Sequence, residues 1–164
     1  MALSCAPAGV PTDPGLSPHA WVQVGGGDDH FEPLADGDPL VMVHGPQGGW
    51  HVLGSVRDGG LDAVVEIRFR VWAEEHGGAL ISDNRYRVQQ VPDPEQPGAY
   101  AYPGMYGYLW VDELAQGELD TPPELLAWQE LRLRMDLVDE RGNATTGQLR
   151  VIAEPDPDDL DMVP

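Results

Sequence analysis

Residues 129–154 read QELRLRMDLVDERGNATTGQLRVIAE, and this stretch decides the fold. Its first half alternates strictly, because the apolar positions 131, 133, 135 and 137 are separated by charged residues. Period-two alternation is typical of a strand that buries one face. Asp139, Gly142 and Asn143 then form a turn signal, since Gly and Asn tolerate the left-handed conformation and Asp bonds turn backbone. The stretch predicts an antiparallel hairpin.

Similar short apolar segments, separated by Gly, Pro and Asp, precede the hairpin. They span residues 19–27, 39–45, 49–58, 61–74, 84–91 and 105–113. Only residues 122–131 favour a helical turn, which begins after Thr121 as a cap with Pro122 inside it. About eight strands with one polar face each indicate two packed antiparallel sheets. We therefore expect an all-β, antiparallel, immunoglobulin-like β-sandwich of about seven to nine strands.

The chain has 164 residues, which suits one domain. Residues 1–18 are rich in Pro, Gly and Ser, and we interpret them as a disordered leader or tether. Residues 19–155 are expected to form the sandwich. Residues 156–164 hold mainly Asp and Pro and are expected to be an acidic disordered tail.

The charge balance limits the classes of partner. The chain carries 9 basic and 28 acidic residues, a formal net charge of −19, and every basic residue is an arginine. So acidic a chain repels DNA, RNA and anionic membrane surfaces. Nucleic-acid binding is therefore not expected, and the expected partner is a protein or glycan at a cell surface.

Two stretches resemble known groups of proteins. Residues 28–57 contain Gly45-Pro-Gln47-Gly48-Gly-Trp-His51 between apolar segments, a Gly-x-Gln-Gly-Gly-x-His pattern that resembles uncharacterised secreted or lipid-anchored β-sandwich proteins of GC-rich bacterial genomes. The turn Asp139-Glu-Arg-Gly142-Asn143 resembles the final hairpin of bacterial immunoglobulin-like domains. The first resemblance implies an exported β-sandwich and carries no known activity.

Cys5 is the single cysteine, so an intrachain disulfide framework is excluded. The start MALSCAP, followed by a Pro- and Gly-rich spacer, is similar to the processing site of a bacterial lipoprotein. On this interpretation Cys5 carries a lipid, and the protein is periplasmic, anchored to the outer membrane or secreted. The alternative is a disordered tail with a bystander cysteine, in which case no membrane contact is expected.

His44 and His51 bracket the glycine turn and are candidate ligands for zinc or copper, with His30 as a third ligand. The register of the hairpin decides whether His44 and His51 lie on the same face and can bind one metal ion. A four-residue loop pairs His44 with His51 on one face, whereas a five-residue loop pairs His44 with Trp50 and turns His51 away. The competing interpretation is a structural turn in which no metal binds.

Calcium is a further candidate, because acidic residues cluster within 28–38. They are Asp28, Asp29, Glu32, Asp36 and Asp38. Their spacing is not that of an EF-hand loop, so solvated turn residues are the plainer interpretation.

Three Arg-x-Arg pairs lie on alternating segments, at 68/70, 85/87 and 132/134. If the three strands share a sheet, the pairs form an arginine-rich face that suits a carboxylate- or sulfate-bearing polymer. The alternative is that Glu66, Glu130 and Asp136 on the same faces neutralise them across strands.

Tyr106, Tyr108 and Trp110 alternate on one face of an aromatic segment. Exposed, they would stack on sugar rings; the pattern more strongly favours packing in the core. The motifs of hydrolases, phosphate-binding loops and dinucleotide-binding folds are absent from the sequence. We therefore expect a non-enzymatic, exported or surface-tethered binding or structural module. A periplasmic metal-binding protein and a calcium-dependent or glycan-binding adhesion-type domain are the alternatives.

Overall fold

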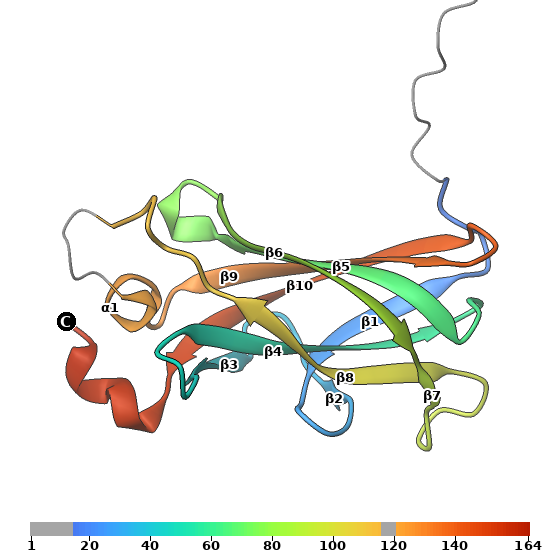
Figure 1. Cartoon of the computed structure of the whole chain (residues 1–164), viewed down its shortest axis with the longest axis horizontal. Coiled ribbons are helices and arrows are strands. Elements are labelled where there is room, and N and C mark those ends of the chain that lie inside the picture. The colour runs from blue at the N-terminus through green and yellow to red at the C-terminus, as the bar shows by residue number, and fades with distance from the viewer. Residues whose placement is uncertain (1–14, 116–120) are drawn as a thin grey trace, which may run out of the picture.

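The computed structural model describes residues 15–115 and 121–164, which form two layers of strands (Figure 1). One layer contains β5 (Val64–Ala73), β6 (Ala79–Gln89), β9 (Glu130–Asp139) and β10 (Ala144–Pro155). The other contains β1 (Trp21–Gly26), β4 (Trp50–Gly59) and β8 (Tyr100–Tyr108). Two-residue strands, β2 (Glu32–Pro33) and β7 (Val91–Pro92), extend this second layer. The predicted β-sandwich is confirmed.

Strand β3 (Pro39–His44) joins the two layers, because it pairs with β10 at one end and with β4 at the other. Its pairing with β10 is parallel, so the expectation of a purely antiparallel sandwich was wrong. A parallel neighbour needs a crossover connection, and the long path from β3 to β10 supplies it. The other strand pairs named here are antiparallel.

The described residues also form three short helices in the connections between strands and after the last strand. They are η1 (Glu74–His76), α1 (Pro122–Leu126) and η2 (Pro157–Met162). Helix α1 begins after Thr121, as expected, and the Glu124 carboxylate accepts the Thr121 N–H at 2.6 Å. In the described part of the chain, no helix is long and apolar enough to cross a membrane.

The core lies between the layers and follows the alternation of β9. Four alternating apolar side chains of β9 are fully buried: Leu131, Leu133, Met135 and Leu137. Phe69 of β5 inserts opposite Gly54 and Gly107, where an added Cβ at Gly54 would lie 2.7 Å from the Phe69 ring. Glycine at these positions therefore lets the large ring fill the space between the sheets.

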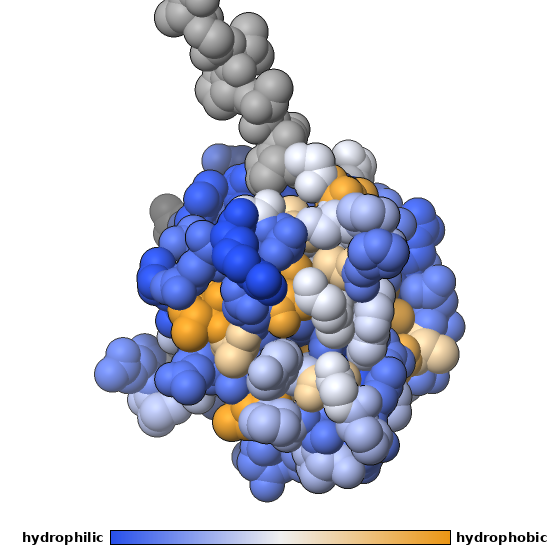
Figure 2. All heavy atoms as spheres, turned by 90° about the vertical axis from the view of Figure 1, so that its right-hand side faces the viewer, coloured by the Kyte–Doolittle hydropathy of each residue, from blue (hydrophilic) through white to orange (hydrophobic). Residues whose placement is uncertain are grey.

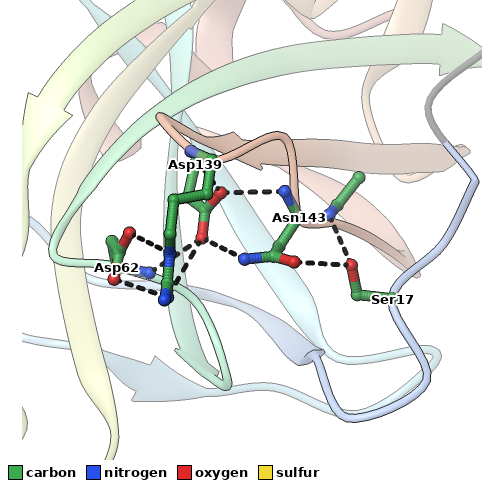
Figure 3. A network of polar contacts seen from close by, with 6 residues as sticks. Ser17, Asp62, Asp139 and Asn143 are labelled. Carbon is green, nitrogen blue, oxygen red and sulfur yellow. Dashed lines mark hydrogen bonds and ion pairs between the residues drawn. The ribbon is translucent and has the colours of Figure 1, made fainter.

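The β9–β10 hairpin has the turn chemistry that the sequence predicts. Asp139 is buried, and its carboxylate accepts the backbone N–H groups of Arg141 and Asn143 at 2.9 and 2.8 Å (Figure 3). Gly142 has a φ of 84°, in the left-handed region that favours glycine. Figure 2 shows this end of the molecule, where most of the surface is hydrophilic and the hydrophobic areas are small and separate.

Both expected domain boundaries need correction. Leu16 forms a parallel bridge with Ala144, and the Ser17 N–H donates to the Ala144 carbonyl at 2.8 Å, so residues 16–18 belong to the domain rather than to the leader. Residues 157–162 form η2 rather than a disordered tail. Its Asp159 is buried against the turn between β3 and β4, because partners there satisfy its charge.

Candidate functional site

The β3–β4 turn adopts the five-residue loop. His44 pairs with Trp50 and Val43 with His51, so His44 and His51 point to opposite faces. The Gly45 N–H donates to the Gly49 carbonyl at 2.7 Å, which closes this loop. The two histidines therefore do not share a metal site.

His44 is held by Trp50 and Asp159. Its ring stacks on Trp50 at 4.2 Å between centroids, and its Nδ1 lies 3.2 Å from Asp159 Oδ1. The indole N–H of Trp50 donates to the other Asp159 oxygen at 2.8 Å. This cluster fastens η2, which follows β10, to the β3–β4 turn.

Replacing Asp159 with alanine is expected to lower the free energy of unfolding by about 1–2 kcal/mol, because two partly buried hydrogen bonds are lost. Urea denaturation at neutral pH measures this, and Asp161→Ala, an exposed acid of the same helix, is the matched control. Equal midpoints for the two variants would contradict the role assigned to Asp159.

His30 lies apart, in the loop between β1 and β2, where Asp29 and Glu32 flank its ring. The hydrogen bond that the His30 ring donates to the Asp29 carboxylate raises the pKa of His30 above its usual value. Among the described residues, no group of three or more His, Cys, Asp and Glu side chains could hold a metal ion.

Two of the acidic residues within 28–38 accept hydrogen bonds from backbone N–H groups. Asp38 accepts the Ala35 N–H at 2.8 Å, and Asp36 accepts the Arg150 N–H at 2.9 Å. Cys5 lies outside the described residues, so its predicted lipidation stays a prediction.

The outer face of β4 and β8 carries an exposed aromatic cluster. Tyr106 and Tyr108 are 44% and 45% exposed, and their rings are stacked at 5.7 Å and 13°. The buried His51 lies edge-on to Tyr106 at 4.5 Å. We call His51, Tyr106 and Tyr108 the aromatic face. Trp110, just beyond it in the chain, is 68% exposed.

The expectation that these aromatic residues pack in the core was therefore wrong. In β8 the inward positions are taken by Met105 and Gly107, and the small Gly107 leaves room for Phe69. The tyrosines between them must face outward, because successive side chains point to opposite faces. Burial lowers the pKa of His51, so this face is uncharged at neutral pH.

The outer face of the other layer carries seven of the nine arginines. They are Arg68 and Arg70 on β5, Arg85 and Arg87 on β6, Arg132 and Arg134 on β9, and Arg150 on β10. These residues are called the arginine face. The three Arg-x-Arg pairs do share one sheet, because β5 lies between β6 and β9.

Most charges on the arginine face are paired across strands. Arg68 makes a two-pronged contact with Asp83 at 2.7 and 2.9 Å. Asp136 accepts from both Arg70 and Arg134. Burial alone would raise the pKa of Asp136, but hydrogen bonds from Thr146 and the two arginines lower it, so it stays ionised.

The remaining pairs join Arg87 to Glu140 at 2.5 Å and to Glu66 at 3.6 Å, Arg132 to Glu74 at 2.7 Å, and Arg150 to Glu130 at 3.0 Å. Both sequence interpretations are thus present together: the arginines share a face, and acids neutralise most of them. The one exception among the described ion pairs is Arg85.

The chain is thus a β-sandwich whose two layers carry unlike outer surfaces, the aromatic face on β4 and β8 and the arginine face on β5, β6, β9 and β10. No protein-family model matches the chain, and no curated protein matches its sequence. Among solved structures it is similar to CopC from Methylosinus trichosporium OB3b, at a TM-score of 0.34 and 12% identity over 74% of this chain and 86% of that chain.

It is also similar to the CooA pilin subunit from enterotoxigenic Escherichia coli. The TM-score is 0.34 and the identity 11%, over 83% of this chain and 99% of that chain. At this level of similarity, no ligand, activity or compartment is carried over to the present chain.

Proposed function

We propose that the chain is a non-enzymatic, exported binding module that takes a neutral glycan on its aromatic face. The observation that carries this proposal is the pair of stacked, half-exposed rings of Tyr106 and Tyr108 on an open sheet surface. A single exposed aromatic residue is common on protein surfaces, whereas several gathered on one face are typical of a binding surface. A flat pair of rings presents the apolar surface on which a sugar ring stacks.

The surroundings of the pair support a neutral ligand. His51 lies beneath Tyr106, and its lowered pKa leaves the imidazole uncharged. Val43 and Leu53 lie on the same face, since Val43 pairs with His51 and Leu53 with Tyr106 across β4. The face therefore combines an apolar surface with phenol hydroxyls, which donate to and accept from sugar hydroxyls.

Removing both rings is expected to weaken binding of neutral oligosaccharides about ten-fold or more, because aromatic stacking contributes roughly 0.5–1.5 kcal/mol per ring. Calorimetric titration of Tyr106→Ala/Tyr108→Ala with cello-, xylo- and chito-oligosaccharides measures this. The control is Trp128→Asn, which removes an exposed aromatic elsewhere and keeps a residue that tolerates the φ of 64° at that position.

The proposal is contradicted if the double variant binds these sugars as tightly as the wild type does. It is also contradicted if none of the three sugars binds the wild type.

The proposed export rests on the sequence around Cys5 and on the resemblance of residues 28–57. The lipid at Cys5 is tested by expressing the chain with its native upstream reading frame in a bacterial host. The mass of the intact protein then shows whether a lipid is attached.

A further inference from the structure

The arginine face contains a hollow that is independent of the aromatic face, since the two lie on opposite layers of the sandwich (Figure 1). The hollow has a volume of about 920 Å³, a size that suits a small ligand. Five arginines line it: Arg68, Arg70, Arg85, Arg87 and Arg134.

The charges in and around the hollow do not balance. Glu66 and Asp136 line it, and Asp83 and Glu140 hold Arg68 and Arg87 from its rim. Five arginines thus meet four carboxylates, which leaves a surplus of one positive charge. In a chain with a net charge of −19, such a surplus is a specific feature of this surface.

Arg85 carries the surplus. It is exposed, and the ion pairs among the described residues include every other arginine of the arginine face but not this one. It stands directly opposite Arg68 across β5 and β6. The Cβ atoms of directly opposite residues lie about 5 Å apart, and like charges in this position destabilise each other. An anion bound by both arginines relieves the repulsion.

The rest of the hollow is suited to a sugar ring. Leu16, Val138 and Ala144 give it an apolar part, and Thr146 and the exposed Glu66 supply hydroxyl and carboxylate oxygens. The Thr146 hydroxyl donates to Asp136 at 2.8 Å, so its oxygen is free to accept from a ligand hydroxyl. One anionic group beside several hydroxyls on an apolar ring is the chemistry of a uronic acid.

We propose that the hollow binds a single uronic acid unit, with its carboxylate between Arg85 and Arg68 and its hydroxyls toward Thr146 and Glu66. A single unit is favoured over a polyanion because the surplus is one charge, while the net charge of the whole chain repels a highly charged polymer. The site goes beyond the proposed function and does not depend on it.

In the test, the full chain is titrated with glucuronate, and NMR records the side-chain N–H resonances of its arginines at each step. Glucuronate is expected to shift the Arg85 resonance, and Arg85→Gln is expected to weaken binding about ten-fold or more, as for one charged hydrogen-bonding group. Arg85 forms no ion pair with any residue of 15–115 or 121–164, so this variant is expected to fold normally. Arg150→Gln, on the same face but outside the hollow, is expected to leave the affinity unchanged.

Three further ligands separate the alternatives. Glucose lacks the anion and acetate lacks the ring, and both are expected to bind more weakly than glucuronate. Acetate equal to glucuronate would show a site for any carboxylate and overturn the assignment to a sugar. Tight binding of heparin, a sulfated polymer, would overturn the single-anion site.

The proposal also fails if glucuronate does not bind, or if Arg85→Gln binds it as the wild type does. Tyr106→Ala/Tyr108→Ala is expected to keep the wild-type affinity for glucuronate. A failure of the aromatic face and a failure of this hollow are therefore distinguishable.

Discussion

Asp139→Ala is expected to lower the free energy of unfolding at neutral pH by about 3 kcal/mol, because a buried, hydrogen-bonded carboxylate is lost. Besides the N–H groups of Arg141 and Asn143, this carboxylate accepts the Asn143 amide at 2.9 Å and the Asp62 N–H at 3.2 Å (Figure 3). Alanine leaves these donors without their partner and loosens the hairpin. Urea denaturation of the variant and the wild type measures the difference.

The difference also depends on pH. Burial raises the pKa of Asp139, but its hydrogen bonds outweigh burial and hold the pKa below the ordinary 3.8. A carboxyl whose folded-state pKa is lowered stabilises the fold above its unfolded pKa, and this contribution is lost as pH falls through the folded value. The gap between wild type and Asp139→Ala should therefore be constant above about pH 5 and shrink in stronger acid.

Glu140→Ala is the matched control, because Glu140 adjoins Asp139 and makes only an exposed ion pair, with Arg87. It is expected to change the stability by less than about 0.5 kcal/mol. An Asp139→Ala variant as stable as Glu140→Ala at neutral pH would contradict the role given to the carboxylate.

The second prediction has the opposite sign. Asp58→Asn is expected to raise the free energy of unfolding by about 3 kcal/mol at pH 8, because it removes a buried charge. Burial raises the pKa of Asp58 from 3.8 to about 6, although a hydrogen bond from Gln90 acts against it. A difference of about two pKa units corresponds to about 3 kcal/mol.

The pH range follows from that raised pKa. Below pH 3.8 Asp58 is protonated in both the folded and the unfolded protein, so its ionisation does not lower the free energy of unfolding. Between pH 3.8 and about 6 the unfolded chain loses the Asp58 proton while the folded protein keeps it, so the stability of the folded protein falls over this range and is level above it. The stability gained by Asp58→Asn should therefore be large at pH 8 and disappear near pH 4.

The hydrogen bonding around Asp58 is a second reason to expect that asparagine stabilises the fold. Asp58 Oδ1 and Gln90 Oε1 are both buried, and neither has a hydrogen-bond partner among the described residues. The amide introduced by the substitution supplies a donor on the side chain that contacts Gln90. Denaturation curves at pH 4 and pH 8 measure the effect, and a variant less stable than the wild type at pH 8 would contradict it.

Asp93→Asn is the control for Asp58→Asn, because Asp93 is also buried but pairs with Arg57 at 2.5 Å. Burial raises its pKa, yet the Arg57 hydrogen bond and the turn backbone hold it below the ordinary value. Removing this charge is expected to destabilise the fold at pH 8. The two buried carboxyls should thus respond to the same substitution with opposite signs.

Much of the architecture was predictable from local pattern. The alternation of residues 129–140 predicted β9 and its buried face, and Asp139, Gly142 and Asn143 predicted the turn that follows. The sequence predicted a shared arginine face on the condition that the three strands belong to one sheet. The pairing of β5 with both β6 and β9 meets this condition. These features depend on residues close in sequence or on strands with one clearly apolar side.

The aromatic face was predicted wrongly for a definite physical reason. In β8 both faces are apolar, so alternation separates Met105 and Gly107 from Tyr106 and Tyr108 but does not say which set is buried. The choice depends on Phe69 of β5, which fills the space left by Gly107. No local signal carries that information.

Alternation and turn residues are enough to specify the two-layer β-sandwich, because they act within a few positions of one another. Three features could be read only from the folded chain: the hairpin register that separates His44 from His51, the contact of Asp159 with His44, and the position of Arg85 opposite Arg68, without an ion pair among the described residues. Each of these depends on the contacts that distant strands and termini make, and on the balance of packing and charge that such contacts create.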